Sequence, residues 1–75
     1  MGHADTKTAS LNATQQALVE LGGAQLTMRK VADRAGVSLG NLQYHFANRD
    51  VLLSALLSRF LEEYEQALAS RALTP

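Results

Sequence analysis

The chain has 75 residues, with seven basic and seven acidic side chains and a formal net charge of zero. A chain this short forms one small domain with a limited hydrophobic core, and without cysteine it has neither a disulfide framework nor a thiolate metal site. No apolar run approaches the ~20 residues of a membrane helix and no secretory signal opens the chain, so we expect a cytoplasmic protein with no membrane partner.

The first predicted element is a helix from Ala9 to Leu21, preceded by a flexible N-terminal arm over residues 1–8, where no hydrophobic periodicity is present. A pair of glycines follows the helix and ends it, and we expect Leu26 in the connector beyond them to fill the core. The predicted inner face of the helix is Leu11, Ala17, Leu18 and Leu21, and its predicted outer face is Asn12, Gln15 and Gln16.

Two short helical patterns joined by a tight turn lie between Thr27 and Phe46, in the segment TMRKVADRAGVSLGNLQYHF. The first is expected over residues 28–35, because apolar side chains recur there at i, i+3, i+4 and i+7 (Met28, Val31, Ala32 and Ala35). Thr27 can cap its N-terminus, which is worth ~1 kcal/mol. Gly36 follows it, at a C-terminal cap that requires a positive φ.

The second pattern is expected over residues 39–46, with Ser38 as its N-cap and with Leu42 one turn before an inward-facing phenylalanine. Ala32 is small, so the two helices can approach closely. Two helices this short and this tightly joined must cross steeply, which is the geometry of a DNA-binding helix-turn-helix; the alternative is an ordinary helical pair. A branched residue at position 32, or any side chain at position 36, is expected to break the unit.

A longer fourth helix is expected from Arg49 to about Ser70, with Asn48 as its N-cap and a length of ~33 Å at 1.5 Å per residue. Its predicted inner stripe is Leu53, Leu56, Leu57, Phe60, Tyr64 and Leu68. The later apolar residues, among them Leu73, are expected to be exposed, because the rest of so short a chain cannot cover them. Exposed apolar stripes of this kind indicate a partner surface.

The charge is unevenly distributed along the chain. Zero net charge argues at first against a nucleic-acid partner. Residues 26–60 nevertheless carry a net charge of +3, whereas residues 1–25 carry −1 and residues 61–75 carry −2. Positive charge is therefore concentrated around the two short helices, although the excess is modest and predicts weak, salt-sensitive non-specific binding.

The sequence VADRAGVSLGNLQYHFANRDVLLSALL resembles the DNA-binding domain of the tetracycline-repressor (TetR) family of bacterial transcriptional regulators. The resemblance extends from about Leu11 to Phe60 and is specific, because small, polar and aromatic positions of the family's pattern agree together. Asn41, Gln43 and Arg49 depart from the residues that the family most often has at these places.

The resemblance implies an all-α fold: a homeodomain-like three-helix bundle with a helix-turn-helix over residues 9–60, plus a longer fourth helix. It makes residues 61–75 the end of that helix and the truncated start of a ligand-binding and dimerisation domain. It also implies a repressor that binds a palindromic operator in double-stranded DNA as a homodimer. A small-molecule effector would act only through the absent domain.

No cofactor or enzymatic activity is expected, because nothing places a nucleophile beside a base and three short helices offer no substantial pocket. The alternative function, from another class, is a small helical protein-interaction module that docks through its long C-terminal helix. Zero net charge and the apolar end of that helix favour this alternative.

The second short helix is expected to lie in the major groove with its N-terminal half toward base edges. With the apolar residues inside, its outward face is expected to be Gly40, Asn41, Tyr44 and His45. Gly40 permits close approach to DNA, Asn41 can pair with N6 and N7 of adenine, and Tyr44 can reach a base or a phosphate. At the start of the helix, beside Ser38, Leu39 either meets a thymine methyl group or packs inside.

Arg29 is placed at a base edge by the resemblance, where it would read guanine; the alternative is a solvated arginine. Lys30 is a phosphate contact or simply exposed, and Arg34 is expected on a solvated face. The resemblance also implies phosphate contacts, which set register without specifying sequence, from Thr27, Gln43, His45 and Arg49. No metal site is expected, because His45 has only His3 in the N-terminal arm as a companion.

Overall fold

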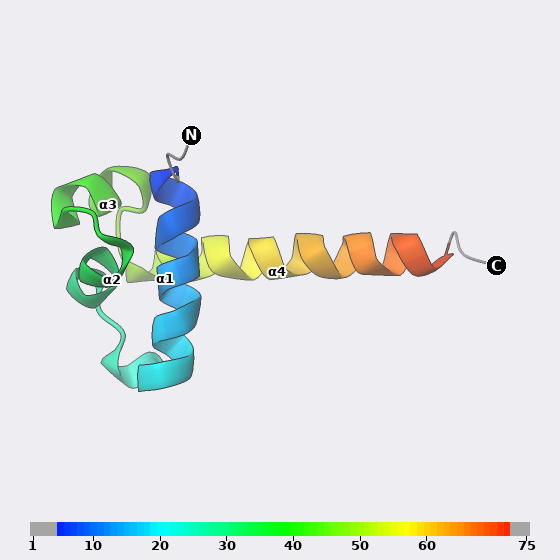
Figure 1. Ribbon diagram of the computed structural model, residues 1–75, viewed down its shortest axis with the longest axis horizontal. Helices are drawn as coiled ribbons and strands as arrows, with labels where there is room; N and C mark the ends of the chain where they lie inside the picture. The colour runs from blue at the N-terminus through cyan, green and yellow to red at the C-terminus, as the bar shows by residue number, and fades with distance from the viewer. Residues whose placement is uncertain (1–4, 73–75) are drawn as a thin grey trace.

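The computed structural model describes residues 5–72, and this part of the chain contains helices and no strands. The elements in chain order are α1 (Thr6–Leu21), the 3-10 turn η1 (Gly23–Gln25), α2 (Met28–Ala35), α3 (Leu39–His45) and α4 (Arg49–Ala72). Figure 1 shows α2 and α3 at one end of the molecule, α1 directly beside them and crossing α4, and α4 running away toward the other end. The molecule is accordingly elongated, with extents of 47 × 34 × 20 Å.

The hydrophobic core lies where α1, α2, α3 and the first turns of α4 meet. Val31 of α2, Leu42 of α3 and Leu52 of α4 have no exposed surface, and Leu26 of the connector is 3% exposed. The predicted all-α fold, a three-helix bundle containing a helix-turn-helix with a longer fourth helix, is confirmed. Among residues 5–72, no helix combines the length and the apolar character that a membrane span requires.

The turn between α2 and α3 has the predicted backbone geometry. Gly36 lies in the left-handed region, with φ 75° and ψ 30°. The backbone N–H of Val37 donates to the carbonyl of Ala32 at 3.0 Å, which satisfies a carbonyl group at the end of α2 and closes a Schellman-type cap. Helix α2 has the predicted bounds, whereas α3 ends at His45, one residue before the predicted end.

The start of α1 differs from the prediction. The helix begins at Thr6 instead of Ala9, because the side chain of Asp5 accepts a hydrogen bond from the backbone N–H of Lys7 at 3.1 Å. A carboxylate at this position satisfies one of the free N–H groups at a helix N-terminus. Residues 6–8 are therefore helical and not part of an arm. Residues 1–4 of the predicted arm, with His3, lie outside the described part of the chain.

The inner face of α1 is lined by small side chains. Ser10, Ala13, Thr14 and Ala17 are buried, whereas the predicted Leu11, Leu18 and Leu21 are half-buried at its edges. The hydroxyl of Thr14 donates to the carbonyl of Ser10 at 2.7 Å and is therefore paired, whereas the buried hydroxyl of Ser10 has no hydrogen-bond partner among residues 5–72. Small residues at the centre of this face allow α2 and α3 to approach α1 closely.

The inner stripe of α4 is also rotated relative to the prediction. Leu56 is buried as predicted, at 2% exposed, and Leu52, which was not predicted to face inward, is 0% exposed. Leu57 and Phe60, which were predicted to face inward, are 58% and 39% exposed. The bundle covers only the first turns of this helix, so a short i, i+4 pair is buried instead of a long stripe. Tyr64 and Leu68 are exposed, as predicted, and the predicted exposure of Leu73 lies outside the described residues.

The turn geometry predicts the effect of a side chain at position 36. A Cβ atom there would meet no atom within 4 Å, so a side chain at this position does not clash with the rest of the protein. The cost of the substitution is then the backbone strain of the positive φ, about 1–2 kcal/mol, instead of the predicted disruption of the helix-turn-helix. We expect Gly36→Ala to lower the free energy of unfolding by that amount in a urea titration.

Gly40→Ala is the matched control for this substitution. A Cβ at Gly40 also meets no atom within 4 Å, and this glycine does not have a positive φ. Alanine is the better helix former by ~1 kcal/mol, so the control is expected to equal or exceed the wild type in stability. Equal stability of the two variants would contradict the role assigned to the turn.

Candidate nucleic-acid interface

The predicted DNA-contacting residues come from α2, α3 and the residues that cap these helices and the start of α4. The two short helices lie together at the end of the molecule away from the C-terminus of α4 (Figure 1). Three members of the set, Leu39, His45 and Arg49, are half-buried. The others are exposed: Thr27, Arg29, Lys30, Ser38, Gly40, Asn41, Gln43 and Tyr44.

Two capping hydroxyl groups hold the helix starts in place. The side chain of Thr27 accepts from the backbone N–H of Lys30 at 3.1 Å, and that of Ser38 accepts from the backbone N–H of Asn41 at 3.0 Å. These two predicted N-caps are confirmed, and so is the third, Asn48, whose Oδ1 accepts from the backbone N–H of Val51 at 3.0 Å. Because the caps fix the first turn of each helix, the exposed side chains beside them are presented from a defined backbone.

The outward face of α3 combines an open position with an exposed aromatic ring. The space around Gly40 is empty within 4 Å of a Cβ position, so packing within the protein does not require glycine there. Tyr44 is 84% exposed, and its ring meets that of His45 edge to face at a centroid distance of 5.2 Å. Leu39 packs against the core, which matches the second of its two sequence interpretations.

Two of the basic side chains in residues 26–60 bind α1. Arg34 is exposed, as expected for a solvated face, and on that surface it pairs with Glu20 at 2.6 Å. Arg59 of α4 donates to Oδ1 of Asn12 at 2.7 Å and to Oε1 of Gln15 at 2.9 Å. These arginines therefore link α2 and α4 to α1, and their guanidinium groups are engaged within the protein, although Arg59 keeps its full charge because its partners are neutral amides.

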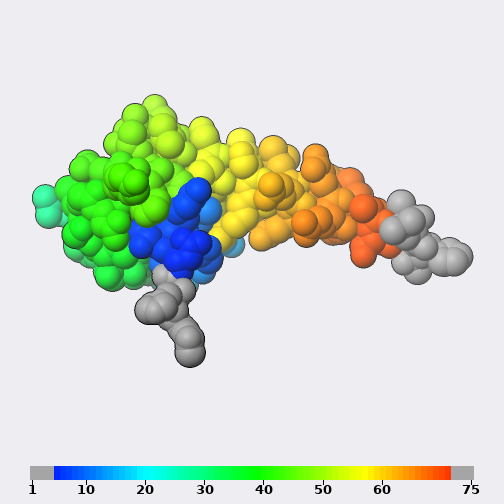
Figure 2. Space-filling view, turned by 90° about the horizontal axis from the view of Figure 1, so that it is seen from above, coloured from blue at the N-terminus to red at the C-terminus, as the bar shows by residue number. Residues whose placement is uncertain are grey.

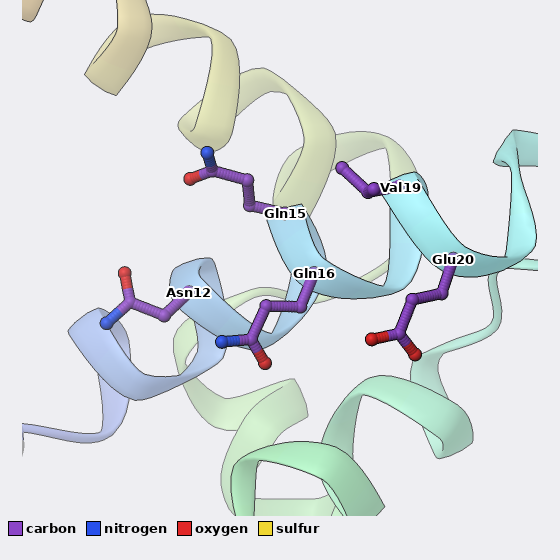
Figure 3. Close-up of a pocket in the computed structure, with 5 residues that line it drawn as sticks. All are labelled: Asn12, Gln15, Gln16, Val19 and Glu20. Carbon is purple, nitrogen blue, oxygen red and sulfur yellow. The ribbon is translucent and has the colours of Figure 1, made fainter.

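Figure 3 shows the α1 surface to which these arginines bind. Gln15 and Val19 point to the α4 side of α1, and Glu20 points to the opposite side. The lining of this surface depression is Asn12, Gln15, Gln16, Val19 and Glu20. None of its polar groups is a nucleophile that lies beside a general base. The side chains of Asn12 and Gln15 are already bonded to Arg59.

Arg29 differs from the other basic residues. Its side chain is exposed, and within residues 5–72 it makes no hydrogen bond or ion pair. The neighbouring Lys30 donates from Nζ to the carbonyl of Gln25 at 3.1 Å. Arg29 is thus the basic side chain of the two short helices that is most available to an external ligand.

Arg49 links the start of α4 to the connector before α2. Its Nε donates to the carbonyl of Leu26 at 3.1 Å, and its Nη2 donates to the carbonyl of Gly23. Two donor groups of this predicted phosphate contact are therefore used within the protein. Their partners are 23 and 26 residues away in sequence, so no local pattern indicated them.

The structure also places a residue beside α3 that the sequence interpretation missed. Thr6, in the first turn of α1, has its Oγ1 3.5 Å from Nδ2 of Asn41. Asp5, which caps this turn, was the available signal: an aspartate immediately before a helix-forming segment is typical of an N-cap. An N-cap at Asp5 predicts a helix that begins at Thr6.

A bundle with a short, capped helix pair, an outward polar helix and an unpaired arginine beside it defines a helix-turn-helix DNA-binding domain. Comparison with known proteins identifies the family. The family described as bacterial regulatory proteins, tetR family, matches residues 11–56. The chain belongs to this family, as its sequence resemblance predicted.

Similar proteins include three named transcriptional regulators. The chain is 36% identical over 61 residues to the HTH-type transcriptional regulator BetI 2 of Chromohalobacter salexigens, which covers 81% of this chain and 30% of that protein. It is 36% identical over 59 residues to BetI of Stenotrophomonas maltophilia, covering 79% of this chain and 30% of that protein. It is 31% identical over 61 residues to TtgR of Pseudomonas putida, covering 81% of this chain and 29% of that protein.

No solved structure matches the chain significantly. The chain aligns with about 30% of the length of the curated relatives. It is the DNA-binding domain of a TetR-family transcriptional regulator and not an enzyme. The alternative function, a protein-interaction module, is not the one that the family supports.

The contacts of Arg49 predict an effect on stability. We expect Arg49→Gln to lower the free energy of unfolding by about 1 kcal/mol, because it removes charged donors from two backbone carbonyls. Arg29→Gln is the control and is expected to stay within about 0.5 kcal/mol of the wild type, because Arg29 is an exposed side chain. Urea titration of both variants measures the difference; equal effects would contradict the brace at Arg49.

Proposed function

We propose that this domain recognises a specific sequence in double-stranded DNA by placing α3 in the major groove, and that the longer protein is a repressor. The observation that carries the proposal is the outward face of α3, which is polar, capped and exposed. Asn41 is assigned to adenine and Tyr44 to a base or a phosphate. The open surface at Gly40 allows the helix backbone to come close to the DNA.

Base recognition extends to α2 and to the start of α3. Arg29 is exposed and unpaired within the described chain, and its guanidinium has the donor geometry to bind O6 and N7 of guanine. Ser38 lies at the N-terminus of α3, the end of a recognition helix that faces base edges. Leu39 is half-buried, so only part of its side chain is left to touch a thymine methyl group.

Phosphate contacts are assigned to the residues around this face. Thr27 and Gln43 are exposed, and His45 lies at the end of α3. The bond between Lys30 and the carbonyl of Gln25 is on the surface, so a phosphate oxygen can replace that carbonyl. Arg49 is half-buried and braced, so its contribution to phosphate binding includes holding the start of α4 in position.

The longer protein is proposed to bind a palindromic operator as a homodimer, because two recognition helices one helical turn apart require two copies. Residues 61–72 then form the end of α4, and the longer protein continues into a domain that dimerises and binds a small-molecule effector. The greater length of the relatives, of which the aligned region is 30%, supports this arrangement. The apolar side chains exposed along α4, with Leu61 and Tyr64 at 53% and 63% exposed, provide a surface for such a domain.

Selection of bound duplexes from a random pool, followed by gel-shift titration, tests the proposal. With the longer, dimerising protein, we expect the selected sequences to share a motif arranged as an inverted repeat, with half-sites about one turn apart. The affinity should fall steeply with salt, because phosphate contacts release counterions. Absence of any shift at low salt, or selected sequences without a common motif, would overturn the proposal.

The two neighbouring basic residues of α2 are expected to behave differently on the selected DNA. Arg29→Ala should cost about 1–3 kcal/mol and relax the preference at one guanine position. Lys30→Ala should weaken binding to all sequences alike and make the logarithmic salt dependence shallower by about 1. Affinities for the selected duplex and its single-base-pair variants separate the two; an equal loss on every duplex for both variants would exclude the assigned roles.

A further inference from the structure

The start of α1 lies against the start of α3. Figure 2 shows the first residues of α1 in contact with the segment that contains α3. Asp5 holds this turn of α1 through the backbone N–H of Lys7 at 3.1 Å, and the hydroxyl of Thr8 donates to the same carboxylate at 3.4 Å. The turn that carries Thr6 is therefore ordered by its own cap.

Asn41 is held at two points. Its backbone N–H is bound by Oγ of Ser38 at 3.0 Å, and its side-chain Nδ2 donates to Oγ1 of Thr6 at 3.5 Å, near the upper limit of a hydrogen bond. The first contact fixes the backbone position of Asn41, and the second restrains the orientation of its side-chain amide plane. Thr6 and Asn41 are 35 positions apart in sequence.

We propose that Thr6 is a positioning residue for base recognition, because its hydroxyl orients the amide of Asn41 toward adenine. This inference rests on the proposed function, in which Asn41 reads adenine. The amide nitrogen carries two hydrogens. The bond to Thr6 occupies one of them and leaves the other, with Oδ1, to meet N7 and N6 of the base.

Orientation matters because an asparagine amide rotates broadly about its last torsion. The reversed amide presents its NH₂ group to the N6 amino group of adenine, where two donors face each other, so pairing with adenine itself selects the direction of the amide. The hydroxyl of Thr6, which can accept from Nδ2 or donate to Oδ1, restrains the plane of the amide. A restraint on the amide plane therefore favours adenine over other bases. It does not strengthen binding to DNA in general, since Thr6 itself need not touch the duplex.

The same geometry implies that this bond adds little to folding. Asn41 is exposed and Thr6 is half-buried, so both groups can bind water when the bond is absent. A positioning role thus has a distinct signature: reduced base discrimination with unchanged stability. A structural role would instead move the unfolding midpoint.

The test compares Thr6→Val, which keeps the shape of threonine but loses its hydroxyl, with Thr6→Ser, which restores the hydroxyl. Binding is measured on the selected duplex and on the duplex altered at the base pair where Asn41→Ala loses its preference. We expect Thr6→Val to reduce discrimination at that base pair about threefold, the scale of one weak hydrogen bond. Thr6→Ser should retain wild-type discrimination, and the unfolding midpoint of Thr6→Val should be unchanged.

Thr8→Val is the matched control on the same turn. It removes a hydroxyl that binds only Asp5 among the described residues, so discrimination should stay at the wild-type level. In an Asn41→Ala background, Thr6→Val should have no further effect on discrimination, because the two residues act through one contact.

Three results would overturn the assignment of Thr6. An equal loss of affinity on all duplexes in Thr6→Val would make Thr6 a phosphate contact. If Thr6→Val keeps its base discrimination while Asn41→Ala loses it, Asn41 recognises the base without help from Thr6. If Asn41→Ala changes no base preference, the assignment of Asn41 under the proposed function fails, and the role of Thr6 fails with it.

Discussion

The turn at Gly36 is the constraint on which the DNA-binding end of the molecule depends. A left-handed residue at this point reverses the chain immediately after α2, and the bond from Val37 to the carbonyl of Ala32 at 3.0 Å closes the reversal. Because only one further residue, Ser38, separates this turn from α3, the direction of α3 follows from the direction of α2. The outward face of α3 is therefore presented by backbone geometry as much as by side-chain packing.

The basic residues divide into those that build the scaffold and those that remain available. Arg34 and Arg59 bind α1, and Arg49 binds the connector between α1 and α2. Such contacts join elements that are distant in sequence. This division explains how a chain with no net charge can serve as a DNA-binding domain. A few exposed groups near α3, Arg29 foremost, are proposed to supply specificity, while the overall electrostatic field of the domain stays weak.

Helix α4 belongs to the bundle only at its beginning. Leu52 and Leu56 are buried there, whereas Phe60, Tyr64 and Leu68 are 39%, 63% and 47% exposed. A helix that leaves its domain with an apolar surface is stable as a helix when something else packs on that surface. The greater length of the related regulators is consistent with a further domain as the source of that packing.

The sequence by itself determined the helix-turn-helix, because caps and turns are decided by neighbours a few residues apart: Ser38 bonds three residues onward, and Gly36 needs only its own φ. It also indicated that Gly40, Asn41 and Tyr44 of α3 face outward, whereas His45, predicted on the same face, is half-buried. Tertiary structure alone decided that Leu52 is buried in place of Leu57, and that Thr6 meets Asn41. These depend on the angle at which helices distant in sequence cross, and that angle is set by packing among many side chains at once, which no local pattern encodes.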